Sequence, residues 1–388
     1  MKKFIRNIVL FLMPVLLYYS VWEIPFYFAG VITKEISDVD ECISFQRKTP
    51  DSLFGLGYSD PTQYYKLANA NYFQAPVIAL GTSRVMQFKS LYFNDCFYNC
   101  GGAVGGNYLE YKNFIENLSY KPEVIILGLD AWVFNDNWNS QIGDTTSFFE
   151  IVKPTFKKKT IMMKIREDYK IKWTFWDLNS FTNNIGFNGI IKESGFLIDG
   201  SYYYGNVYRY PENQLDYKFT DTLNRIETGR SRFEWGNHID PETLIQLEIL
   251  LAYCKDNEIQ VVGFLAPFAP TVYKAMEDSN NYEYLKEITP SCRELFFRYG
   301  FSFFDYMNPI QLKVTDDYFL DGFHGSDVVY GYIIEDFIEK NPYLQTGGES
   351  HVFTPFFAEH LPIFQYFMST NGDFYEISDL LIPVIRFR

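Results

Sequence analysis

Short apolar runs alternate with amphipathic stretches along most of this 388-residue chain. The runs PVIAL, CFYNC, EVIILGL, IQVVGFL and FSFFDY have the length of strands, and NYLEYKNFIENL and LIQLEILLAYCKDN have the spacing of helices with one apolar face. This alternation predicts an α/β fold in which helices cover both faces of a parallel sheet. Such sheets hold their sites at the carboxyl ends of the strands, so we expect functional residues after Leu80, Asn99 and Leu129.

Two stretches interrupt the alternation. Residues 135–234 are rich in Trp, Tyr, Phe, Asn and Lys, and are too long for an ordinary connection, so we expect an insertion that caps the carboxyl edge of the sheet. Residues 343–388 form an aromatic C-terminal extension without strand-helix rhythm. Aromatic surfaces of this kind suit sugar rings, although additional hydrophobic core is the commoner explanation. The predicted organisation is a lead-in at 31–75 and an α/β domain at 76–342 that contains the insertion.

The N-terminal segment, residues 1–30, has the pattern of a membrane anchor. Lys2, Lys3 and Arg6 precede an uncharged apolar run from Ile8 to Val21, and aromatic residues follow. Cations on the cytoplasmic side and aromatic residues at the interface favour a signal anchor, meaning one N-terminal transmembrane helix. A cleaved signal peptide is the main alternative and a buried helix the lesser one, since no small-x-small cleavage site follows. An anchor would place the remaining chain outside the cytoplasm.

Charge and composition exclude several classes of function. The formal net charge is −14, whereas binding to a phosphate backbone needs clustered cations, so nucleic acid is not an expected partner. The chain contains no Walker loop, no G-x-G-x-x-G motif and no cluster of metal-ligand spacing, so neither a cofactor nor a metal is expected. The five cysteines are odd in number and lack a CxxC pair, and they do not decide the compartment.

Three polar residues suggest nucleophilic chemistry. Ser83 lies in GTSR, directly after the first apolar strand, where a nucleophile would be exposed, although a helix N-cap is the ordinary role of such a serine. His324 follows Asp321 by three residues in DGFH. That spacing lets the carboxylate reach one ring nitrogen and leaves the other for a nucleophile, although an Asp/His turn that caps a helix has the same pattern.

Two further strand ends carry candidate groups for an oxyanion hole. The run GGAVGGN follows Asn99, and its glycines permit a close backbone approach with N–H groups aimed at an oxyanion, although a tight turn explains them equally. Asp130 follows the third strand in LGLDAW. Each of these signals is weak alone. Together, the three strand ends and the Asp-x-x-His motif form one set of residues that indicates a single site.

The order GTSR, NCGGAVGG, LGLDAW and DGFH resembles the SGNH/GDSL hydrolase superfamily. Within it, the chain looks most like the membrane-anchored branch of DltD-like D-alanyl-transfer proteins and bacterial polysaccharide O-acetyltransferases. The resemblance covers about residues 76–130 and 260–340, and it implies a flavodoxin-like three-layer sandwich. It also implies a catalytic triad of Ser83 as nucleophile, His324 as base and Asp321 as the acid that orients the base.

The oxyanion hole is the least regular part of this resemblance. Gly102 or Gly105 is the expected glycine, but the spacing from Asn99 is irregular. Asp130 stands where many members of the superfamily carry Asn. Because an anion beside a developing oxyanion is unfavourable, either Asp130 faces away or the hole differs from the usual one.

The resemblance implies an extracytoplasmic O-acyltransferase at the bacterial cytoplasmic membrane. It would move an acyl group, which we expect to be acetyl, to hydroxyls of an exported polysaccharide or a teichoic-acid-like glycan. A multi-pass membrane-bound O-acyltransferase would supply the acyl group. An anchored esterase with the same triad, and a non-catalytic scaffold or glycan-binding subunit, remain as alternatives from the sequence.

Overall fold

The computed structural model describes residues 1–20, 24–93, 97–139, 151–155, 157–169 and 183–340. The chain divides into two compact units. The smaller unit comprises Met1–Pro61 and Lys153–Ile198, and the larger comprises Thr62–Val152 and the chain from Asp199 onward. Much of the predicted insertion therefore groups with the N-terminal segment. The predicted C-terminal extension, Cys96, His351 and His360 lie outside the described residues.

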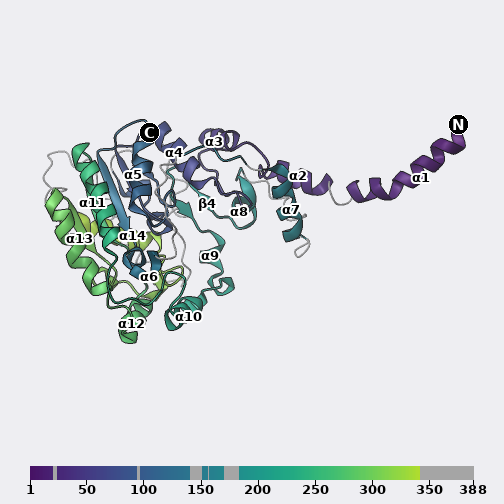
Figure 1. The fold of residues 1–388 in the computed structure, drawn as a ribbon. Helices are drawn as coiled ribbons and strands as arrows, with labels where there is room; N and C mark the ends of the chain where they lie inside the picture. The colour runs from purple at the N-terminus through teal and green to yellow at the C-terminus, as the bar shows by residue number, and fades with distance from the viewer. Residues whose placement is uncertain (21–23, 94–96, 140–150, 156, 170–182, 341–388) are drawn as a thin grey trace. The chain divides into compact units, whose positions relative to one another are not determined.

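The larger unit is a mixed α/β structure around a parallel five-stranded sheet (Figure 1). Its strands are β1 (Val77–Leu80), β2 (Phe97–Asn99), β3 (Val124–Leu129), β6 (Gln260–Leu265) and β7 (Ser302–Asp305), in the order β2-β1-β3-β6-β7. All the pairings between these strands are parallel. The predicted strands and the predicted central parallel sheet are therefore confirmed. The strand order is consistent with a flavodoxin-like fold.

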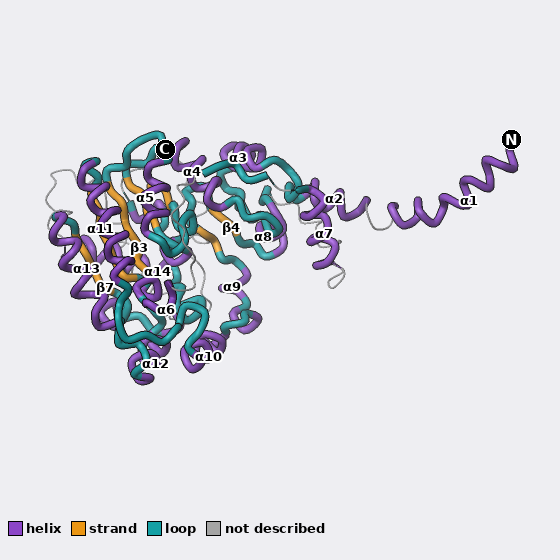
Figure 2. The backbone as a smooth tube through the Cα atoms, viewed as in Figure 1, coloured by secondary structure: helices purple, strands orange, loops and turns teal. Residues whose placement is uncertain are grey.

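Helices cover both faces of this sheet (Figure 2). Those of the larger unit are α4 (Thr62–Phe73), α5 (Tyr108–Glu116), α6 (Asp136–Asn139), α9 (Asn206–Arg209), α10 (Thr220–Thr228), α11 (Pro241–Asp256), α12 (Pro270–Ser279), α13 (Leu285–Tyr299) and α14 (Asp327–Lys340), and a short strand β5 spans Tyr202–Tyr203.

Successive residues of β6 show the two layers, because neighbouring residues of a strand point to opposite faces. A Cβ on Gly263 would lie 2.1 Å from the ring of Phe296 in α13. The ring of Phe264 has its centroid 6.5 Å from that of Tyr330 and 6.0 Å from that of Phe337, both in α14. Helices α13 and α14 thus lie on opposite faces, and β3 between them is buried along its whole length.

Capping residues explain where α5 and α11 begin. Asp240 precedes α11, and its carboxylate accepts the N–H groups of Glu242 and Thr243 at 3.2 and 3.1 Å. Asn107 caps α5 in the same way, with the N–H of Leu109 at 2.8 Å. Side-chain acceptors at this position satisfy amides that have no partner inside the helix.

The smaller unit contains α1 (Lys2–Tyr18), α2 (Ile24–Ile32), α3 (Val39–Lys48), α7 (Lys158–Tyr169), α8 (Gly186–Ile191) and the short strand β4 (Gly195–Phe196). Its own core consists of apolar side chains from α2, α7 and α8 and from the turn after α2, namely Phe26, Ala29, Ile36, Ile161, Ile165 and Phe187. Glu35 is buried there, and its carboxylate accepts the N–H groups of Gly57 and Phe187 at 2.6 and 2.7 Å.

Among the described residues, no helix has both the length and the apolar character needed to cross a bilayer. The predicted anchor at residues 1–30 stays a prediction.

A fully buried lysine supports the turn after β2. Lys66 of α4 has no exposed surface, and its ammonium group donates to the carbonyl oxygen of Asn99 at 3.0 Å and to that of Gly200. Burial disfavours the charged form and lowers the pKa of Lys66 to about 7. The free energy of unfolding is therefore linked to the protonation of this one side chain.

We expect the contribution of Lys66 to the free energy of unfolding to rise between pH 7 and 8.5. In this range the unfolded lysine keeps its proton while the folded one loses it, so the unfolded state binds more protons and stability rises with pH. The slope reaches at most about 1.4 kcal/mol per pH unit. Urea unfolding at both pH values should show the free energy of unfolding of the wild type rising relative to that of Lys66→Met. The exposed Lys286→Met is the control that should follow the wild type at both pH values.

Candidate active site

Two of the turns that carry candidate residues meet where the strand order reverses. In the order β2-β1-β3 the chain leaves β1 for one side of the sheet and later returns to the other side. Open α/β sheets bind their ligands outside the carboxyl ends of the strands at such a point. Ser83 follows the end of β1, and Asp130 directly follows β3. The fold therefore places both residues at the switch point.

Ser83 begins a single turn of 3-10 helix, η2 (Ser83–Val85), that is pressed against the sheet. A Cβ on Gly128 of β3 would lie 2.1 Å from a methyl carbon of Val85, so only glycine leaves room for this side chain. Ser83 itself stays partly exposed. As the first amide of the turn, its N–H has no acceptor within the turn, which makes it a donor for a bound oxyanion.

Ser83, His324 and Asp321 form a continuous hydrogen-bond relay. The Oγ of Ser83 is 2.8 Å from Nε2 of His324. The Nδ1 of His324 is 2.7 Å from Oδ2 of Asp321. Ser83 and His324 are separated by 241 positions in the chain, yet they meet at hydrogen-bonding distance. The structure thus brings together the three residues predicted as a triad, in the connectivity that a serine nucleophile requires.

The carboxylate of Asp321 is held by more than the histidine. Its Oδ1 accepts the backbone N–H groups of Phe323 and His324 at 2.9 and 2.8 Å. Burial raises the pKa of Asp321, but the charge of His324 and these hydrogen bonds outweigh it, so the pKa lies below its ordinary value. Asp321 is therefore ionised at neutral pH and stabilises a protonated imidazole.

Arg84 connects the Ser83 turn to the loop that carries His324, and the sequence reasoning did not single it out. The guanidinium is buried and donates to the carbonyl oxygens of Phe323, Ala266 and Pro267 at 2.9, 2.8 and 2.5 Å. It also pairs with Oδ1 of Asp130 at 3.2 Å. One side chain thus joins the ends of β3 and β6 to the loop that carries His324. The GTSR motif was the available signal, but nothing local indicates these distant partners.

Replacing Arg84 should destabilise the whole unit. Arg84→Met keeps most of the side-chain volume but leaves a buried carboxylate and three carbonyl groups without their donor. Removing one partner of a buried ion pair costs about 3–5 kcal/mol. We expect a loss of this size in the free energy of unfolding from urea titration. Arg298→Met, which removes an exposed arginine from its pairs with Glu248 and Glu294, should leave the value unchanged.

A loss in Arg84→Met no larger than in Arg298→Met would contradict the bridging role of Arg84. A double variant that also carries Asp130→Asn tests the cause. It should recover part of the loss, because the unpaired charge is then absent.

The groups predicted for the oxyanion hole have other partners. Asp130 is buried, pairs with Arg84, and accepts the hydroxyl of Thr82 at 2.7 Å on Oδ2. The N–H of Gly102 donates to the carbonyl oxygens of Gly81 and Thr82 at 2.9 and 3.1 Å, with φ at 80°. The N–H of Gly105 donates to Glu110 at 3.0 Å. Asp130 therefore contacts the Ser83 turn through Thr82 and Arg84.

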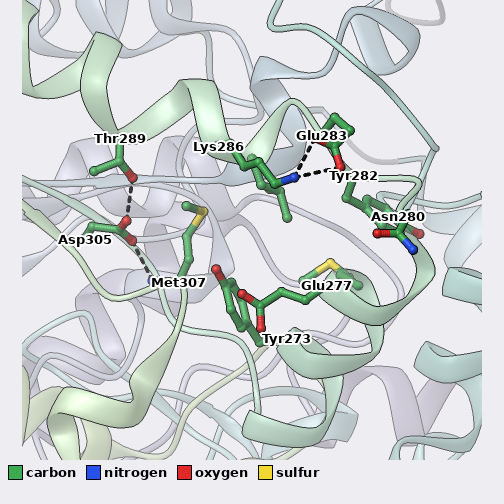
Figure 3. Close-up of a pocket in the computed structure, with 11 residues that line it drawn as sticks. Tyr273, Glu277, Asn280, Tyr282, Glu283, Lys286, Thr289, Asp305 and Met307 are labelled. Carbon is green, nitrogen blue, oxygen red and sulfur yellow. Dashed lines mark hydrogen bonds and ion pairs between the residues drawn. The ribbon is translucent and has the colours of Figure 1, made fainter.

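Described residues of the larger unit line two of its cavities. One of about 570 Å³ adjoins the loop before Asp321 and is lined by Asp216, Tyr217, Lys218, Phe319 and Leu320 among others. The second, of about 300 Å³, lies at the end of β7 between α12 and α13, where Tyr273, Glu277, Lys286 and Asp305 surround it (Figure 3). No triad residue lines either cavity. The first is the nearer in sequence to the triad, and its volume lies in the range of small-molecule pockets.

Within the described ranges, no group of three or more His, Cys, Asp or Glu side chains is arranged to hold a metal ion. Comparison of the chain with family models, with curated proteins and with solved structures finds no match.

Proposed function

We propose that this chain is an SGNH-type serine O-acyltransferase. It moves an acyl group, which we take to be acetyl, through acyl-Ser83 to a hydroxyl of an exported glycan. The hydrogen-bond relay from Ser83 through His324 to Asp321 carries this proposal. Its position at the switch point of a parallel sheet supports it, as does the order of motifs that resembles the SGNH/GDSL superfamily. The flavodoxin-like SGNH fold belongs to the same proposal.

In the first half-reaction, Oγ of Ser83 attacks the acyl carbonyl carbon of the donor ester while Nε2 of His324 takes the hydroxyl proton. The negative charge moves to the carbonyl oxygen, toward which the Ser83 N–H can donate. When the tetrahedral intermediate collapses, the bond to the leaving oxygen breaks and His324 returns the proton to it. Asp321 keeps the proton on Nδ1 throughout, so Nε2 is the atom that exchanges protons.

The second half-reaction repeats these steps with the glycan. A sugar hydroxyl attacks the acyl carbon of acyl-Ser83 and gives its proton to Nε2 of His324. Collapse breaks the bond to Oγ, which recovers the proton from His324. The product is an ester on the sugar, and the enzyme returns to its first state. Water in place of the sugar would give an esterase, so the two activities share every residue named above.

The surroundings of the enzyme complete the proposal. The N-terminal residues 1–30 would anchor the chain in the bacterial cytoplasmic membrane, with the triad on the extracytoplasmic side. A multi-pass membrane-bound O-acyltransferase would then supply the acyl group across the membrane.

A transfer assay tests this function. The full-length protein in detergent is incubated with p-nitrophenyl acetate and either an oligoglucuronate or a cello-oligosaccharide, and mass spectrometry follows both acetate and acetylated sugar. We expect acetylated sugar, formed in the wild type and absent with Ser83→Ala. Free acetate without acetylated sugar would favour the esterase, and turnover unaffected by Ser83→Ala would favour a scaffold.

A further inference from the structure

An exposed arginine lies one aromatic ring away from the catalytic base. The guanidinium carbon of Arg232 is 5.6 Å from the ring centroid of Phe323 and 5.5 Å from that of Trp132. The ring of Phe323 is in turn 4.6 Å from the imidazole of His324. Arg232 is exposed, whereas both rings under it are buried. An exposed positive charge thus lies over the ring that contacts the imidazole of His324.

The backbone fixes Arg232 in this position. Its φ is 79° and that of Ser231 is 54°, both in the left-handed region that favours glycine. Non-glycine residues persist there where the surrounding structure holds them, often at functional sites. The next residue, Phe233, is buried, with its ring 6.0 Å from those of Phe268 and Phe323. The adjacent residues Arg232 and Phe233 therefore both contact the ring of Phe323, which in turn contacts His324.

Among the described residues, the guanidinium of Arg232 lies over aromatic rings and not beside a carboxylate. In the part of the chain that the structure describes, its guanidinium has neither an ion pair nor a hydrogen bond, whereas Arg84, Arg225 and Arg298 each pair with a carboxylate. The chain as a whole carries a net charge of −14 and repels anions. A planar guanidinium stacked on rings keeps its edge free for two parallel hydrogen bonds to a carboxylate or a phosphate.

We propose that Arg232 binds an oxyanion on the acceptor, a sugar carboxylate or a phosphodiester, so that the glycan acylated at this site is anionic. This inference rests on the proposed function, because it assigns the substrate of that same triad. Arg232 acts in recognition, by placing the charged group of the acceptor so that a hydroxyl near it reaches Nε2 of His324.

Binding in a Ser83→Ala background tests this proposal without any chemistry. Isothermal titration calorimetry on the full-length chain in detergent measures the dissociation constants of three ligands of similar length. These are an oligoglucuronate, an oligo(glycerol phosphate) and a neutral cello-oligosaccharide. We expect at least one anionic ligand to bind about tenfold more tightly than the neutral one at low salt. The tighter of the two anions identifies its source as a uronate or a phosphate.

Substitution of Arg232 should remove that advantage. Arg232→Gln is expected to weaken the anionic ligand about tenfold and leave the neutral one unchanged. Arg232→Gly should have the same effect on binding. Glycine also adopts the left-handed backbone of this position without strain, so this variant should fold like the parent. Arg230→Gln is the matched control in the same turn. Its guanidinium contacts the hydroxyl of Thr228 at 3.0 Å, and anion binding should persist.

Equal binding of anionic and neutral ligands by the parent, or an unchanged anion affinity in both Arg232 variants, would overturn this assignment. These outcomes are separate from the transfer assay. A wild type that binds anions through Arg232 but transfers no acetyl group would defeat the proposed function alone.

Discussion

Ser83→Ala is expected to lower the turnover of p-nitrophenyl acetate by about 10⁴-fold or more, because the variant loses the atom that carries the acyl group in the proposed mechanism. Replacing Oγ leaves His324 with a protonated Nδ1 but nothing to activate. The turn itself should remain, since Thr82 caps it and Val85 anchors it to Gly128 through contacts that do not involve the hydroxyl. Thermal unfolding should therefore stay close to that of the wild type.

Labelling with a fluorophosphonate gives an independent measurement of the same residue. The wild type should accept one label, located on Ser83 by peptide mass spectrometry, and Ser83→Ala should accept none. Ser90→Ala is the matched control, because the backbone N–H of Ser90 is held by Asp199 at 2.8 Å, and it should label normally. Label on another serine, or activity that survives in Ser83→Ala, would refute the assignment of the nucleophile.

The strands and the triad were predictable from the sequence for physical reasons. Parallel strands buried on both faces are apolar at every position, as β3 is, and each is followed by a polar turn at the edge where sites form. Ser83 lies in such a turn after β1, whereas His324 lies in the loop before α14. The Asp-x-x-His spacing is local, so the contact between Asp321 and Nδ1 of His324 follows from the turn itself.

What the sequence pattern left out depends on contacts between distant segments. Arg84 could be read as an ordinary surface cation, because its partners Asp130, Ala266 and Phe323 lie on separate segments that only the folded sheet edge unites. The same reason hides Arg232, whose position depends on a left-handed turn and on the ring of Phe323. It also hides the grouping of residues 153–198 with the N-terminal segment, since no local pattern marks it.

Asp321→Asn should lower turnover by about 10⁴-fold while leaving the ring of His324 in place. Oδ1 of Asp321 accepts two backbone N–H groups, so the asparagine must keep its carbonyl oxygen at that position. Its amide nitrogen then faces Nδ1 of His324 and donates to it, which moves the ring proton to Nε2. A histidine with its proton on Nε2 presents a donor to Ser83 and cannot accept the hydroxyl proton. The expected loss of turnover thus comes from the wrong tautomer of His324 and not from a displaced ring.

The dependence on pH distinguishes this account from simple unfolding. Because the folded pKa of Asp321 lies below its unfolded value, its carboxylate contributes stability at pH values above the unfolded pKa, and that contribution is lost as pH falls through the folded pKa. Asp321→Asn should therefore lose less stability than the wild type on acidification from neutral pH. Asp256→Asn, at an exposed position of α11, should retain both full turnover and the wild-type acid response. Equal turnover in Asp321→Asn and Asp256→Asn would mean that the tautomer of His324 does not affect turnover. It would refute the role of Asp321 in the relay.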